Sequence, residues 1–267
     1  MIPPGKLRSS AVPLIPFLFS LILSMSTAGS RVFWQDSGFY LTGIHEMSVL
    51  PSHGFVAYLL AAKLWTLAVS PIAGFTLSVH LFSAFCGAGA AAFLALAARG
   101  FLKRIRPDRP PEGPAIAAAV VASAGYCFWN GATLAKPYAL YYLTLSGMLW
   151  ILVTAERRLD FFLLAVAVGF SWAAHPSAAI LVPALLAYAW ARRDKVRELR
   201  AFGFLAILLL AAGVAFVPSF VVLPILAKRE MLCSFGDPRT PGEVWSHLRG
   251  ANYTDFKGAW GFDLARA

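Results

Sequence analysis

Side chains that can do acid–base chemistry are scarce in this chain and gather in short polar stretches between apolar runs. The first stretch, WQDSGFYLTGIHEM (34–47), holds Asp36, His45 and Glu46. The others contribute His53, Lys136, Tyr138, His175, Asp237, Arg239 and His247. A carboxylate can take a proton from a hydroxyl, and cations or imidazoles can stabilise an anion. These residue types together suit a site that binds an anionic substrate and moves a proton.

Each of these candidates also has a structural interpretation. Asp36 begins D-S-G, a sequence typical of a helix N-cap, although a capping residue can also be catalytic. His53 stands in a turn marked by proline and glycine, and His175 precedes a proline. Lys136 and Tyr138 are residue types that are common at a membrane interface. The sequence leaves these alternatives open, as it does for His45, which could be an interfacial polar residue.

The composition indicates a membrane protein that crosses the bilayer several times. The chain has 267 residues, of which 59% are hydrophobic and 13% charged, and its mean hydropathy is +0.68. Soluble proteins contain about 25% charged residues. The net charge of +10 fits basic loops beside anionic lipid better than a nucleic-acid partner, since no basic or aromatic–basic motif stands clear of the apolar runs.

Cofactor chemistry has little support in the sequence. Cys86 and Cys127 lie inside apolar runs and Cys233 stands alone, without the paired spacing of a disulfide framework or zinc site. One carboxylate with scattered histidines does not make a metal site. We therefore expect no evident cofactor, with a need for a divalent metal left open.

Seven apolar runs are predicted to cross the membrane as helices. They lie at 11–29, 75–98, 115–135, 139–155, 161–175, 176–191 and 201–227. The first follows two basic residues, so a cleavable signal peptide is the alternative interpretation. Two of the others, 161–175 and 176–191, are short for a span, and the turn between them at His175 is expected to lie below the membrane surface. His80, within the second run, is interpreted as an interhelical contact.

An eighth apolar run, 54–70, is predicted to lie at the outer membrane surface. Lys63 stands in its middle, and a lysine at the bilayer centre costs about 2.5–3.5 kcal/mol. Counting the run as a span would also place 99–113, with five basic residues, outside the cell, against the positive-inside rule. At the surface, Lys63 can extend its amine to the lipid headgroups.

This topology places fourteen lysines and arginines in the cytoplasm and eight outside. The N-terminus is then cytoplasmic, and all the candidate site residues lie on the outer face. We expect an integral protein of a bacterial inner membrane, with its active face periplasmic or outer. Residues 1–227 would form the transmembrane domain, and 228–267 a short outer segment.

Four stretches carry a resemblance to a known family. They are QDSGFYLTGIHEMSVLPSHGFVAYLL (35–60), FWNGATLAKPYALYYL (128–143), FSWAAHPSAAILVPAL (170–185) and FGDPRTPGEVWSHLRGANY (235–253). With an apolar first helix and an early Asp in the first outer loop, the chain resembles the GT-C superfamily of integral-membrane glycosyltransferases. More narrowly, it is similar to domain-of-unknown-function family 2723, which includes protein O-mannosyltransferases.

The resemblance implies an all-α core of seven transmembrane helices, with two juxtamembrane helices near 36–48 and 54–70. It implies a sugar donor on a polyprenyl phosphate and a hydroxyl acceptor on a protein or glycan. Asp36 would be the general base of an inverting transfer. The substrate-binding residues would be His45, His53, Lys136, Tyr138, His175, Asp237 and Arg239, with Lys136, His175 or Arg239 supplying a cation to the leaving phosphate.

Three positions depart from the family pattern. Phe39 stands where an acid usually follows D-S-G, P-S-H-G (51–54) replaces H-P-P-G, and Lys136 replaces an acid. These changes are compatible with another sugar or acceptor, and also with a non-catalytic subunit. A transporter of lipid-linked substrates is a further alternative, but the sequence lacks the internal repeats typical of one.

Overall fold

Every regular element in the described part of the chain is a helix, which confirms the predicted all-α class. The computed structural model describes residues 4–28, 36–51, 53, 55–156, 158–181, 183, 185, 187–188, 200–229 and 234–251. The elements are α1 (Pro4–Thr27), α2 (Asp36–Glu46), α3 (Val56–Ala73), α4 (Phe75–Ile105), α5 (Glu112–Ala124), α6 (Tyr126–Thr133), α7 (Tyr138–Thr154), α8 (Arg158–Ala174), the 3-10 helix η1 (Pro176–Leu181), α11 (Arg200–Ala227) and α12 (Pro241–Leu248).

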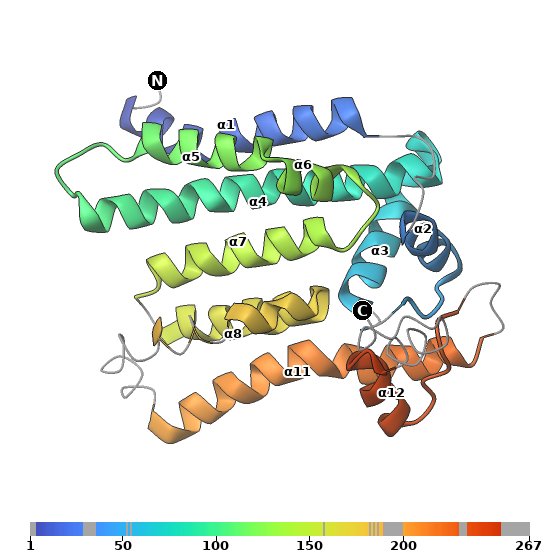
Figure 1. The fold of residues 1–267 in the computed structure, drawn as a ribbon. Coiled ribbons are helices and arrows are strands. Elements are labelled where there is room, and N and C mark those ends of the chain that lie inside the picture. The colour runs from blue at the N-terminus through green and yellow to red at the C-terminus, as the bar shows by residue number, and fades with distance from the viewer. Residues whose placement is uncertain are drawn as a thin grey trace, which may run out of the picture.

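Five long helices form a layer. Figure 1 shows α1, α4, α7, α8 and α11 side by side in this order, and each contacts the next. Apolar residues line these helices on all sides, a pattern typical of helices that face protein on one side and lipid on the others. Long helices of this composition are typical of a bilayer-spanning bundle.

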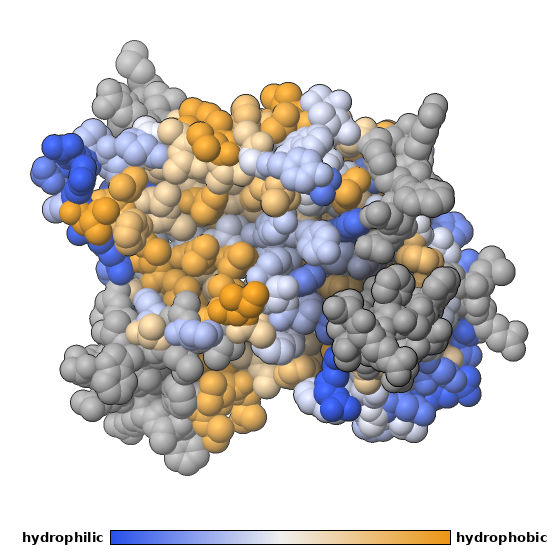
Figure 2. Space-filling view, in the orientation of Figure 1, coloured by the Kyte–Doolittle hydropathy of each residue, from blue (hydrophilic) through white to orange (hydrophobic). Residues whose placement is uncertain are grey.

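Charged residues are concentrated at the ends of this layer. At one end, the last turn of α4 carries Lys103 and Arg104, and the α4–α5 connection carries Arg106 and Arg109; all four side chains are exposed. The opposite end gathers α2, α3 and α12 (Figure 1). In Figure 2 hydrophobic residues predominate between a hydrophilic left edge and a hydrophilic lower right. This distribution is the one expected of a membrane protein.

The number of helices that could span a membrane differs from the seven predicted. Four described helices are long and apolar enough, namely α1, α3, α4 and α11, and a fifth is counted if α5 and α6 form one bent span. α7 and α8, both predicted spans, have 17 residues each. Six of the sixteen residues of the predicted span 176–191 lie outside the described residues, and the segment begins as the 3-10 helix η1.

The predicted single helix over 115–135 is wrong. Gly125 adopts an extended backbone conformation (ψ 138°), and α5 and α6 meet there at 67°. Side-chain hydrogen bonds to three helices hold α6 in place: the Trp129 indole donates to Thr27 Oγ1 at 2.9 Å, His80 Nδ1 bonds the Thr133 carbonyl at 2.8 Å, and the Tyr142 hydroxyl donates to the Cys127 carbonyl at 3.3 Å. The interhelical role predicted for His80 is confirmed.

Helix α3, predicted to lie at the surface, crosses the end of the layer in Figure 1 rather than running within it. Its length and composition alone would also allow a span. Lys63 Nζ donates to the carbonyl of His45 at 2.8 Å, in the last turn of α2, where the helix dipole favours a cation. Lys63 therefore has a protein partner in addition to any lipid headgroup.

Candidate functional site

Helix α2 places Asp36 and His45 at the end of the bundle where the other candidates gather. Asp36 is its first residue, and the Asp36 side chain lies outside the described part of the structure. The helix is anchored by the buried side chains of Leu41 and Ile44. His45 is exposed, and its ring meets that of Phe75 edge-on at 5.0 Å.

The loop from α2 to α3 has an unusual backbone. Met47, His53 and Phe55 all have positive φ angles, of 56°, 69° and 37°. A residue other than glycine in such a conformation lowers the free energy of unfolding by about 1–3 kcal/mol, so contacts around it must hold it there. Strained backbone of this kind clusters at binding and catalytic sites, which makes the 47–55 loop a candidate.

The contacts that hold this loop come from α12, far along the chain. His247 Nε2 donates to the Leu50 carbonyl at 3.1 Å, and the His53 amide donates to the His247 carbonyl at 3.2 Å. His53 Nδ1 donates to the Leu248 carbonyl at 2.6 Å. Since a carbonyl only accepts, His53 carries its proton on Nδ1 here, and its Nε2 is available to a ligand. We call this set of three hydrogen bonds the α12 clasp.

His175 is enclosed by aromatic rings. Its imidazole lies 5.6 Å from the ring centre of Phe55 and 5.3 Å from those of Tyr138 and Tyr141. His175 Nδ1 accepts a hydrogen bond from the Ser177 amide at 3.2 Å, at the start of η1. Burial lowers the pKa of His175 to about 4, and the nearby charge of His53 acts in the same direction. At neutral pH, His175 is therefore uncharged and offers an Nε2–H donor rather than a positive charge.

We expect the protein to lose stability as the pH falls from about 6.5 towards 4. Burial also lowers the pKa of His247, so the unfolded chain binds more protons than the folded one in this interval. Stability from these neutral histidines is complete above their unfolded pKa of about 6.5 and declines as acid protonates them. Thermal unfolding in detergent at several pH values measures this. A His175→Gln variant should show a shallower decline, and a midpoint that is flat or rises on acidification would contradict the assignment.

The turn between α6 and α7 contributes the next two candidates. Lys136 is half-buried, and its amide donates to the Leu134 carbonyl at 2.8 Å. Tyr138 is the first residue of α7, and its ring contacts His175. The structure thus brings Tyr138 and His175 together. Phe55, which contacts His175, also has its ring centre 6.2 Å from that of His53.

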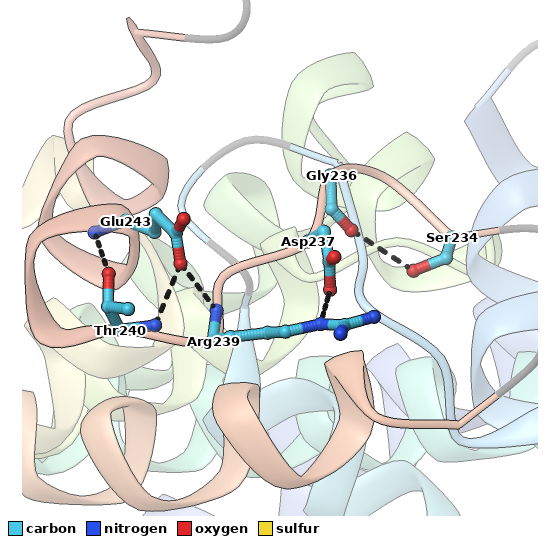
Figure 3. A network of polar contacts seen from close by, with 6 residues as sticks. All are labelled: Ser234, Gly236, Asp237, Arg239, Thr240 and Glu243. Carbon is cyan, nitrogen blue, oxygen red and sulfur yellow. Dashed lines mark hydrogen bonds and ion pairs between the residues drawn. The ribbon is translucent and has the colours of Figure 1, made fainter.

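Asp237 and Arg239 form the entry to α12 (Figure 3). Arg239 Nε pairs with Asp237 Oδ1 at 2.7 Å, and both side chains are more than half exposed. The Arg239 and Thr240 amides donate to Glu243 Oε2, while Thr240 Oγ1 accepts from the Glu243 amide, which completes a capping box. Hydrogen bonding to Thr240 lowers the pKa of Glu243. The substrate-binding role of Asp237 and Arg239 stays a prediction.

A cavity of about 290 Å³ lies beside the α12 clasp. One wall comes from the 53–55 turn, the end of α8 and η1, through His53, Phe55, Trp172, Ala173, Pro176 and Ala179. The other wall comes from α11, α12 and the residue after it, through Ala215, Phe216, Ser219, Trp245, Leu248 and Arg249.

The cavity has an aromatic side and a polar side. The rings of Trp172 and Phe216 are 6.2 Å apart, and those of Phe216 and Trp245 are 6.1 Å apart, so the three form a continuous row. The polar residues that line the cavity are His53, Ser219 and Arg249. Ligand sites are commonly apolar clefts with a few such polar groups. Within the described residues, no three His, Cys, Asp or Glu side chains are grouped as metal ligands would be.

The amino-acid sequence matches a known protein family. The model of the protein O-mannosyl-transferase TMEM260 N-terminal domain matches residues 36–198, which is more than half of the chain. The chain belongs to this family. No curated protein and no solved structure matches it.

The TMEM260 N-terminal domain supplies only one wall of the cavity. Its match begins at Asp36 and contains His53 and Trp172, but it ends before α11. Phe216, Trp245 and Arg249 therefore come from the sequence that follows the family domain. Both parts of the chain therefore line the cavity.

Sequence reasoning missed several residues of this cavity. Trp172, Trp245 and Arg249 stand inside the stretches 170–185 and 235–253, which were singled out for their family pattern, so a signal existed. Phe216 lies in a uniformly apolar run and carries no such signal. Its role depends on which side of α11 faces α8 and α12.

Proposed function

We propose that this protein is a membrane glycosyltransferase that moves mannose or a similar sugar from a polyprenyl phosphate to a hydroxyl group. The acceptor is a protein serine or threonine, or a glycan. Membership in the protein O-mannosyl-transferase TMEM260 N-terminal family supports this reaction class. The observation that carries the proposal is the cavity with an aromatic wall between helices and a polar side at the bundle end, a shape and chemistry suited to an amphipathic donor.

The chemistry needs one base and one stabilised anion. In the proposed reaction Asp36 accepts the proton of the acceptor hydroxyl, whose oxygen forms a bond to the anomeric carbon from the side opposite the phosphate. The bond from the anomeric carbon to the phosphate oxygen breaks, and the configuration inverts. The lipid phosphate leaves as an anion, so it needs a positive charge more than an acid.

The remaining candidates are assigned to substrate binding. Tyr138 and His175 are proposed to bind sugar hydroxyls, since phenols and imidazoles can each donate or accept a hydrogen bond. His53 is proposed to bind the donor from the cavity that it lines. Lys136 is proposed to add positive charge at the α6–α7 turn, and His45 to contact the acceptor from the exposed side of α2.

The membrane arrangement completes the proposal. The candidate site would face the outer compartment, because it lies at the end opposite the basic α4–α5 connection, which the positive-inside rule places in the cytoplasm. A seven-helix core of the GT-C type would include the segment 176–191. A donor anchored in the outer leaflet would then reach the cavity without leaving the membrane.

Sugar transfer in isolated membranes tests the function. Membranes with and without the intact chain are incubated with radiolabelled mannosyl polyprenyl phosphate or with a nucleotide-linked mannose, and label in protein and glycan is counted. We expect transfer from the lipid-linked donor only, and only with the chain present. Well-expressed chain that adds no transfer from any donor would instead indicate a non-catalytic subunit.

A further inference from the structure

The polar side of the cavity contains one permanently charged side chain, Arg249. It caps the C-terminus of α12, where its amide donates to the Trp245 carbonyl at 3.0 Å. Its side chain is exposed, and in the described part of the chain its guanidinium has no ion pair. An arginine that lines a cavity without a carboxylate partner leaves its donors for a ligand.

The other arginine on this segment is in a different situation. Arg239 is paired with Asp237 (Figure 3). It precedes the N-cap of α12, whereas the cavity-lining residues of this segment, Trp245, Leu248 and Arg249, follow further along. Its charge is largely compensated by that carboxylate. If the segment supplies a cation to an anionic ligand in the cavity, Arg249 is the better placed of the two.

We propose that Arg249 and His53 form a phosphate-binding pair at the polar side of the cavity. The proposal deepens and rests on the proposed function, because it assigns the cation that holds the donor phosphate. It places that cation outside the family-matched region 36–198, on the segment 234–251. The site is therefore formed by two parts of the chain that the α12 clasp joins.

The chemistry of the pair favours phosphate. Guanidinium presents several N–H donors in a planar fork that matches phosphate oxygens, and such charge-assisted bonds are about twice as strong as neutral ones. His53 uses Nδ1–H for the Leu248 carbonyl, so its Nε2 is the ring nitrogen that remains for the ligand. The same hydrogen bond to Leu248 couples His53 to the residue next to Arg249.

The aromatic row points to the rest of the ligand. Trp172, Phe216 and Trp245 provide apolar surface next to the polar pair, and Trp172 and Phe216 lie on helices α8 and α11. A free phosphate would leave this row uncovered. An isoprenyl phosphate would use both sides of the cavity, with its chain on the rings and its head on Arg249 and His53.

Equilibrium binding of radiolabelled farnesyl phosphate to the full chain in detergent tests the proposal. We expect Arg249→Gln to weaken binding about tenfold or more, which is the loss of one charge-assisted hydrogen bond, and Arg249→Lys to weaken it less. Arg229→Gln removes an exposed cation just after α11 and is the matched control, with no change expected. Farnesol, which lacks the phosphate, should bind wild type and Arg249→Gln equally.

The outcomes separate the alternatives. If inorganic phosphate displaces the labelled ligand as strongly as unlabelled farnesyl phosphate does, the pair binds a soluble phosphate. If it displaces the label only weakly, the pair binds a lipid phosphate. Unchanged binding in Arg249→Gln, or a loss in Arg239→Gln in its place, would overturn the proposal. The binding assay transfers no sugar, so its result stands even if the transferase assay fails. If Arg249→Gln keeps both sugar transfer and farnesyl phosphate binding, the phosphate-binding pair is rejected and the proposed function is not.

Discussion

Replacing Asp36 with Asn is expected to lower sugar transfer by about a hundredfold to ten-thousandfold, the usual contribution of a general base. The amide is nearly the same size as the carboxylate but cannot accept the proton of the acceptor hydroxyl. The assay is initial-rate transfer from mannosyl polyprenyl phosphate in membranes, normalised to the amount of chain. Among substitutions that keep the size of the side chain, this is the one for which the proposed mechanism predicts the largest loss of transfer.

The same substitution separates the catalytic from the capping interpretation of Asp36. Asp36 is the first residue of α2, and Asn caps helices about as well as Asp does. Asp36→Asn should therefore leave the thermal unfolding midpoint unchanged, whereas Asp36→Ala should lose both activity and about 1 kcal/mol of stability. Full transfer by Asp36→Asn would leave capping as the only role of this residue.

Replacing Gly169 with Ala is expected to destabilise the protein by about 1–3 kcal/mol, the usual cost of overpacking. Gly169 lies on α8, and a methyl group there would overlap the Ala211 carbonyl of α11 and approach Val214 Cβ to 2.9 Å. Backbone does not move aside as a side chain can, so the two helices would have to separate. Trp172 and Phe216 follow on these helices, so ligand binding should weaken as well.

Gly213 on α11 is the matched control for this substitution. A methyl group at Gly213 meets no atom within 4 Å, and alanine favours a helix over glycine by about 1 kcal/mol. Gly213→Ala should be neutral or slightly stabilising in thermal unfolding of the purified chain in detergent. Equal stability of the Gly169 and Gly213 variants would mean that α8 and α11 are not packed as closely as described.

Hydropathy and charge predicted much of the fold. The apolar runs located α1, α4 and α11. The surface position of 54–70, argued from Lys63, stays a prediction, because α3 is also long and apolar enough to span. The bend at Gly125 could not be predicted, because the apolar composition continues across it and hydropathy does not report backbone direction. The pairing of α12 with the 47–55 loop also has no local signal, since it joins residues almost 200 positions apart.

The sequence indicated which residue types the candidate site contains, but it indicated little of how they are arranged. The sequence placed His53, Tyr138 and His175 on one face; in the structure the rings of His53 and His175 both lie beside Phe55, and the ring of Tyr138 lies beside His175. It did not indicate that burial keeps His175 neutral, or that Arg239 is paired with Asp237. Burial and pairing depend on tertiary packing, and residue type and spacing along the chain do not determine them.

Photo-crosslinking of the donor tests the central claim most directly. Membranes with the intact chain are irradiated with a mannosyl isoprenyl phosphate that carries a benzophenone on its lipid chain, and the adducts are mapped by mass spectrometry. The account predicts adducts on 172–179 and 215–219, which line the cavity, and their loss when unlabelled donor competes. Specific adducts confined to the opposite end of the bundle, around 99–113, would contradict it.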